Sequence, residues 1–177
     1  QIRGGNKKFR ESSNILRYDS PEGRLQMQYD SLNDAGLQLN SQFKSAYYWN
    51  IAKRQVIKAG MQGFMIFTKG KVLQNELFRI GGFRNLRGFD DDSYSSSAYL
   101  ISTLEYRFLL DRNSFLQLFA DHAYMEVISQ NVINDWDHYL GIGAGIQFQT
   151  KAGAFVLQLA VGKRPGEGFD FSATKVH

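Results

Sequence analysis

The stretch that decides the fold is "GIGAGIQFQTKAGAFVLQLAVGK", residues 141–163. In its first half, apolar residues from Leu140 to Phe148 take every second position and alternate with glycine or glutamine. The second half repeats the alternation from Phe155 to Val161. A period of two is typical of a strand with one apolar face, and "TKAG" between the halves is short enough for a hairpin turn. The sequence therefore predicts an antiparallel hairpin here.

The same alternation returns along the rest of the chain. It covers the segments 24–32, 36–48, 55–67, 97–110, 115–127 and 169–177, with a weaker ninth candidate at 9–18. No window shows a sustained period of 3.6 residues, and the glycines inside strand patterns suit bends or close approach of another backbone. We therefore expect an all-β, antiparallel fold with eight or nine strands, in one domain over residues 1–177.

Composition narrows the class of protein. The formal charge of +4 is spread among scattered Lys and Arg, which argues against nucleic acid as a partner. There is no cysteine, hence no disulfide and no thiolate metal site. No apolar run approaches the roughly 20 residues of a membrane helix. The opening "QIRGGNKKFR" has no apolar core and is not a signal peptide, so we expect a processed chain or an internal fragment.

Two architectures compete for such strands, a soluble β-sandwich and a membrane barrel. Sandwich strands usually have about 5–6 residues, whereas barrel strands need about 9–11 to cross a bilayer at a tilt. The segments here are long, and their second face carries polar and charged residues suited to a wet lumen. The strand-end runs "AYYW" (46–49), "DWDHY" (135–139) and "GFDF" (168–171) would form aromatic girdles. These features favour a transmembrane β-barrel.

Connection lengths point the same way. The turns "NDAG", "DRNS" and "TKAG" are short, whereas 69–96 and 128–137 are predicted to be long loops. Outer-membrane barrels have short turns on one side and long loops on the other. In the longest connection, "FRIGGFRNLRGF" (78–89) is equipped to fold back and pack, and 90–97 is expected to be a solvated return. The run Asp90 to Asp92 belongs to that return and is not read as a metal site.

At this loop the sequence resembles a known family. "NLRGF" (85–89) is similar to the arginine-glycine-aromatic motif in the sixth extracellular loop of BamA/TamA-type outer-membrane assembly proteins. "LEYRF" (104–108), "LFADHAY" (118–124) and the hairpin at 141–163 follow in the order of that family's next strands. Five strand candidates follow the motif, as they do in the family, and the resemblance covers residues 55 to 177.

The resemblance implies the C-terminal half of a 16-stranded barrel in the bacterial outer membrane. The loop motif would be Arg87, Gly88 and Phe89, with Arg87 turned inward to reach Glu105 and Asp121. The alternation of residues independently assigns both acids to the lumen face, because their neighbours in sequence are the apolar ones. Two inward carboxylates make a suitable receptor for a planar guanidinium, and Gly88 allows the backbone to bend beside the wall.

The function implied by the resemblance is insertion or translocation of polypeptides at the outer membrane, through a weak lateral seam between the first and last strands. Expected partners are outer-membrane lipid, client polypeptides and accessory subunits that are periplasmic or lipoproteins. No cofactor, metal site or catalytic site is expected, since no nucleophile motif occurs and His122, His138 and His177 are far apart in sequence. The alternatives are a free-standing eight-stranded barrel with a structural or adhesive role and a soluble β-sandwich binding protein.

Two departures from the family pattern stand out. "HAY" (122–124) replaces the glycine that usually follows the aspartate and a small residue on this strand. The chain also ends in "TKVH", without the terminal aromatic residue by which such barrels are commonly recognised for assembly. We therefore expect the final residues of the barrel, as well as its first strands and any periplasmic domains, to lie outside this chain.

Overall fold

The structure is a computed structural model that describes residues 2–6, 37–68, 72, 74–129, 132–151, 153–169 and 175–176. The strands are β1 (Ile2–Asn6), β2 (Leu37–Ala52), β3 (Gln55–Thr68), β4 (Phe78–Ile80), β5 (Tyr94–Asp111), β6 (Ser114–Ser129), β7 (Val132–Thr150), β8 (Gly153–Lys163) and β9 (Lys175–Val176), with a 3₁₀ turn η1 (Gln74–Glu76). They form one antiparallel sheet in the order β1-β2-β3-β5-β6-β7-β8-β9, with β4 paired to β5. The predicted all-β, antiparallel class is confirmed.

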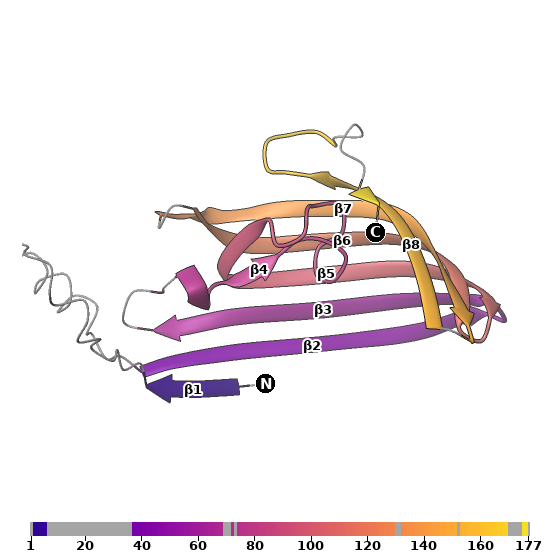
Figure 1. Ribbon diagram of the computed structural model, residues 1–177, viewed down its shortest axis with the longest axis horizontal. Helices are drawn as coiled ribbons and strands as arrows, with labels where there is room; N and C mark the ends of the chain where they lie inside the picture. The colour runs from indigo at the N-terminus through magenta and orange to yellow at the C-terminus, as the bar shows by residue number, and fades with distance from the viewer. Residues whose placement is uncertain are drawn as a thin grey trace, which may run out of the picture.

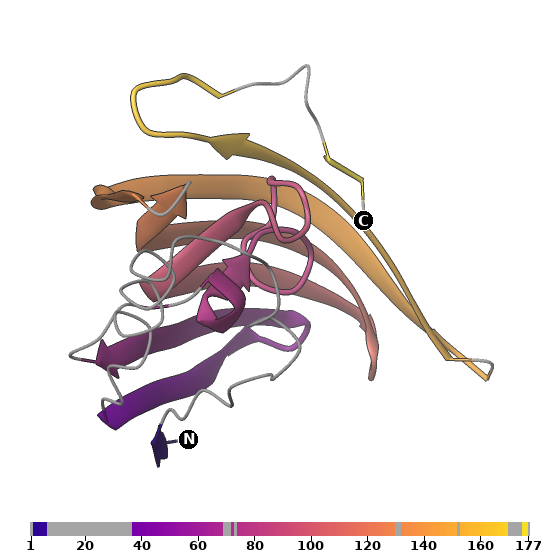
Figure 2. The ribbon, with the colours of Figure 1, turned by 60° about the vertical axis from the view of Figure 1, so that its left-hand side comes forward.

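The sheet is curved and holds the connection between β3 and β5 on its concave side (Figures 1 and 2). We call residues 74–93 of this connection the docking loop. Strands β2, β5, β6 and β7 each have 16 or more residues, enough to cross a bilayer at a tilt. Tight turns join β2 to β3, β5 to β6 and β7 to β8 at one end of the sheet.

The described strands form an open sheet, with β1 and β9 at its two edges. Within the described ranges there is no second sheet stacked on it, which argues against the alternative of a soluble β-sandwich. Nor is the sheet a closed eight-stranded barrel. It is consistent with part of a larger barrel wall. Among the described residues, no helix is long and apolar enough to span a membrane.

The two faces of the sheet differ in chemistry as the alternation predicts. On the convex face, Leu104 and Leu118 are 56% and 59% exposed, although both are large and apolar. On the concave face, their sequence neighbours Glu105 and Gln117 are buried. A soluble protein rarely exposes a broad apolar surface, because its contact with water is unfavourable. The convex face is therefore the face suited to lipid.

Aromatic pairs on the convex face lie toward the two ends of the strands. Tyr47 and Trp49 meet edge to face at 4.5 Å near the tight turn after β2. Tyr124 and Trp136 lie 4.8 Å apart toward the opposite end, where β6 pairs with β7. This placement agrees with aromatic girdles at the two levels of a membrane interface. The run at 168–171 is described only as far as Phe169.

Two predicted connections are partly strands in the structure. The expected loop 128–137 belongs to β6 and β7, with Ile128 paired to Ile133 across a very short connection. The expected solvated return 90–97 ends at Ser93, because Ser96 is buried under β4 and pairs with Phe78. Beyond the apolar band neither face of a strand must be apolar, so polar strand ends look like loops in the sequence. The predicted loop 90–97 is therefore wrong from Tyr94 onward, and the predicted loop 128–137 is wrong where β6 and β7 are described.

Three further segments complete the comparison with the predicted strands. The candidates 9–18 and 24–32 lie outside the described residues. Of the candidate 169–177, the structure describes β9 and an isolated bridge between Phe169 and Lys163. β1 was not predicted, and it pairs with the first half of β2.

Candidate functional site: the loop arginine on the inner wall

The docking loop folds back on itself before it reaches the wall. The backbone N–H of Asn85 donates to the carbonyl of Gly82, and Gly82 forms an isolated bridge with Leu86. The side-chain amide of Asn85 donates to the carbonyl of Arg79 at the base of the loop. The hook so formed places Leu86 and Arg87 side by side against the concave face.

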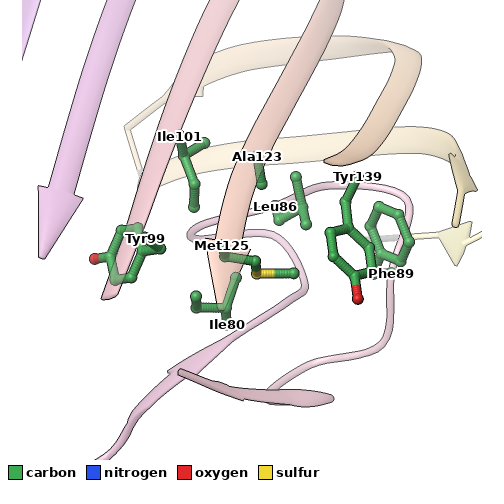
Figure 3. Close-up of a cluster of buried hydrophobic side chains, with 8 residues drawn as sticks. All are labelled: Ile80, Leu86, Phe89, Tyr99, Ile101, Ala123, Met125 and Tyr139. Atoms are coloured by element: carbon green, nitrogen blue, oxygen red, sulfur yellow. The ribbon is translucent and has the colours of Figure 1, made fainter. Parts of the chain in front are cut away.

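Apolar packing anchors the hook. Ile80 and Leu86 are fully buried against wall residues of β5, β6 and β7 (Figure 3). The wall side of this cluster consists of Tyr99, Ile101, Ala123, Met125 and Tyr139. Complete burial of one aliphatic side chain is worth about 1.5–3 kcal/mol. The polar second face that the sequence predicts therefore does not extend to this end of the strands, where the concave face is apolar and covered by the loop.

Arg87 binds Asp121 of β6 as a fork. Its Nε lies 2.6 Å from Oδ2 and its Nη2 lies 2.7 Å from Oδ1, and its backbone N–H also donates to Oδ2 at 3.3 Å. Two parallel, charge-assisted hydrogen bonds to one carboxylate define both the position and the plane of the guanidinium. The hydroxyl of Thr103 donates to Oδ1 at 2.9 Å and completes the shell of Asp121.

The same guanidinium reaches a second acid and an aromatic ring. Nη1 of Arg87 lies 3.1 Å from Oε1 of Glu105 on β5. The guanidinium carbon lies 3.7 Å from the centroid of the Phe119 ring, within the range of a cation–π contact. Glu105 is itself shared, since Lys58 Nζ approaches Oε1 at 3.0 Å and Arg107 Nε donates to Oε2 at 2.9 Å. All of these side chains lie on the concave face.

Burial and charge act in opposite directions on Arg87. Burial alone disfavours the charged guanidinium, but the hydrogen bond to Asp121 and the negative charges of Asp121 and Glu105 outweigh it, so the pKa of Arg87 is raised. Arg87 and Asp121 are both nearly inaccessible to solvent, with exposures of 7% and 1%. A buried charge that loses its partner is strongly destabilising, which makes this pair the most sensitive contact of the site.

Glycines of β7 and β8 let the loop backbone touch the wall backbone. A Cβ at Gly141 would lie 1.9 Å from the carbonyl oxygen of Arg87, and a Cβ at Gly162 would lie 2.5 Å from that of Gly88. Gly88 has a φ of +93°, which L side chains rarely adopt, and its Cβ would meet the carbonyl of Val161 at 2.6 Å. The alternation in "GIGAGI" therefore contributes both an apolar convex face and a flat concave surface for the loop.

The structure brings the predicted site residues together. Arg87 touches both Glu105 and Asp121, and Phe89 packs edge to face on Tyr139 at 6.0 Å. Sequence reasoning did not name Lys58, Arg107 and Phe119 as members of the site. The signal for two of them was available, because Arg107 and Phe119 are each two residues from a named acid and so share its face.

The histidines and the loop aspartates considered in the sequence do not belong to this site. His122 and His138, which are far apart in sequence, are in contact across β6 and β7, with Nε2 and Nδ1 3.0 Å apart on the convex face. Their diagonal position in the strand register explains the contact. Asp91 and Asp92 are exposed. Among the described residues there is no group of three or more potential metal ligands, and His177 lies outside that part of the chain.

A comparison with protein families gives one match. The family described as the Omp85 superfamily domain matches residues 23–175, which include the wall strands from β2 to β8 and the whole docking loop. A search of curated proteins gave no match.

Proposed function

The chain belongs to the Omp85 superfamily, and from this membership we propose that it inserts polypeptides into the bacterial outer membrane, or translocates them across it, in the manner of the BamA/TamA type. Members of the superfamily are bacterial outer-membrane proteins that act as transporters or assembly factors and are not enzymes. The observation that carries the finer proposal is the buried fork between Arg87 and Asp121. It supports an inward loop that carries the Arg87, Gly88 and Phe89 motif.

The docking loop holds some strands of the wall together and leaves one edge of the sheet without such contacts among the described residues. The loop contacts β5, β6, β7 and β8, so it ties these strands together on the concave side. By contrast, the described part of β9 pairs with β8 through Lys175 and Val176. A short or irregular edge strand leaves backbone donors and acceptors available to an added strand. We place the lateral seam of the proposed mechanism on the β9 side of the sheet.

The proposed partners follow from the faces of the wall. The convex face, with its exposed leucines and its aromatic pairs, would contact outer-membrane lipid. Client polypeptides would use the seam or the lumen. Accessory subunits, periplasmic or lipoprotein, are part of the proposal by resemblance to the BamA/TamA type.

The proposal is tested in cells of the source bacterium whose only copy of the full-length protein carries Asp121→Asn. The substitution removes the carboxylate that binds the buried Arg87 as a fork and leaves only the contact with Glu105, a loss of about 3–5 kcal/mol, enough to release the loop. We expect quantitative proteomics of the outer membrane to show loss of folded barrel proteins if insertion is the activity. Loss of secreted proteins with normal barrel proteins would indicate translocation. Arg87→Ala should have the same effect.

The matched control is Asp92→Asn, which removes the same charge at an exposed position of the same loop. It should leave both protein populations unchanged. If Asp121→Asn releases the loop, as judged by protease cleavage, and neither barrel nor secreted proteins decrease, the proposed function is wrong.

A further inference from the structure

A cavity of about 240 Å³ lies between the docking loop and the concave face. It is lined by residues of the hook and of the wall from β2 to β8. Five basic side chains and two acidic ones face it: Lys44, Lys58, Arg84, Arg87 and Arg107 against Glu105 and Asp121. Positive charge is therefore in excess within this cavity.

The excess positive charge belongs to two residues. Lys58, Arg87 and Arg107 already contact the two acids. Lys44 and Arg84 are exposed, and within the described part of the chain neither has an acidic partner. Lys44 and Arg84 lie on segments that are in contact. Lys44 pairs in register with Gln62, and the side-chain amide of Gln62 lies 3.5 Å from the carbonyl oxygen of Asn85, the residue after Arg84.

The far side of the cavity offers an unused acceptor. Gln158 of β8 is 5% exposed, and its Oε1 is buried without a hydrogen-bond partner among the described residues. An unsatisfied buried amide oxygen costs about 1–3 kcal/mol, so a donor at this position is favourable. A ligand that satisfies the whole cavity must thus bring negative charge to Lys44 and Arg84 and a donor to Gln158.

We propose that this cavity binds an acidic, extended segment of a polypeptide. A carboxylate of the segment lies at Lys44 and Arg84, and a backbone N–H donates to Oε1 of Gln158. An extended polypeptide has both groups, whereas an inorganic anion such as sulfate has acceptors only and leaves Gln158 unsatisfied. The inference rests on the proposed function, since the bound segment belongs to a client polypeptide inside the barrel.

Fluorescence anisotropy with the purified full chain in detergent tests the inference. The probes are a labelled glutamate-rich peptide, the same peptide with glutamine in place of glutamate, and a lysine-rich peptide. We expect the acidic peptide to bind most tightly, and we expect its affinity to fall as the salt concentration rises. Lys44→Glu and Arg84→Glu should each reduce its affinity by about tenfold, because each exchanges an attraction for a repulsion. Both residues are exposed, so folding is unaffected.

Two controls make the result specific to the cavity. Lys53→Glu makes the same change of charge at the exposed turn between β2 and β3, which does not line the cavity, and should bind the acidic peptide as the unchanged protein does. Gln158→Leu should weaken the binding of the acidic peptide, because the backbone N–H of the peptide loses its acceptor. Equal binding of the acidic and glutamine peptides, equal effects of Lys44→Glu and Lys53→Glu, or displacement by sulfate at equal charge concentration would each overturn the inference.

The peptide assay is independent of client insertion. Absence of acidic-peptide binding together with loss of clients in Asp121→Asn cells would refute the inference alone. Binding in the assay without any effect of Asp121→Asn on clients would refute the proposed function and leave the polypeptide site in place.

Discussion

At the scale of single residues, the site depends on the shape of Arg87 as much as on its charge. The guanidinium fork satisfies both oxygens of Asp121, and a third nitrogen reaches Glu105. A lysine ammonium is a compact point charge on a flexible stem and cannot match two carboxylates in one plane. Arginine at this position is therefore required by geometry.

Arg87→Lys keeps the charge and removes the fork. We expect it to lower the free energy of unfolding in urea by about 1–3 kcal/mol, because buried carboxylate oxygens lose charge-assisted donors. Arg84→Lys is the matched control at an exposed position of the same loop, where surface substitutions stay within about 0.5 kcal/mol. If both variants unfold at the same urea concentration, the fork contributes nothing to stability.

Some members of the site were readable from the sequence and others were not. The alternation within each strand assigned Glu105 and Asp121 to the inner face, and the resemblance connected them to Arg87. Their role in function stays a prediction. Lys58 was not named, because its contact with Glu105 depends on the register between β3 and β5, which alternation in one strand does not reveal.

At the scale of elements, the docking loop behaves as a small structure with its own core. Its apolar residues fill the concave face near one end of the strands, and its backbone lies directly on the glycines of β7 and β8. Both contacts need a close approach, so a single methyl group at the wrong place should separate loop and wall. Of the glycines at which the loop and wall backbones meet, Gly141 leaves the least space.

Gly141→Ala tests this contact. The added Cβ would lie 1.9 Å from the carbonyl oxygen of Arg87, so the loop must move, at a cost of about 1–3 kcal/mol. Arg87 is buried while the loop is docked, and trypsin cleavage after Arg87 therefore reports its release. We expect faster cleavage in Gly141→Ala. Gly60→Ala is the control, since its Cβ would have an ordinary contact of 3.6 Å; equal rates in the two variants would contradict the account.

The centres of elements were predictable, and their ends were not. The predicted segments 55–67, 97–110 and 115–127 lie inside observed strands, and so does the described part of 36–48, from residue 37 on. The predicted segments are shorter than the observed strands, because the alternation fades where a strand leaves the apolar layer. Backbone pairing continues there, as between Ser129 and Val132, and has no sequence signature of its own.

At the scale of the whole molecule, the sheet has an apolar convex face suited to lipid and a concave face that carries the buried acids and the docking loop. Alternation predicts two faces but not what each meets, since a sandwich core and a lipid layer are both apolar. Strand length and the charged second face favoured the barrel. The pairing of β1 with β2 was not predictable, because "IRGGN" has neither alternation nor an apolar face.

The central claim is that Arg87 holds the loop to the inner wall through Asp121. A double-mutant cycle on the full chain in detergent, with Arg87→Ala, Asp121→Ala and both together, measures this contact most directly. We predict that each single variant loses about 3–5 kcal/mol of unfolding free energy, because each removes the opposite charge that is hydrogen-bonded directly to a buried group. The double variant should lose much less than the sum, giving a coupling of at least about 2 kcal/mol. Losses that add within about 0.5 kcal/mol would show that the two residues do not interact.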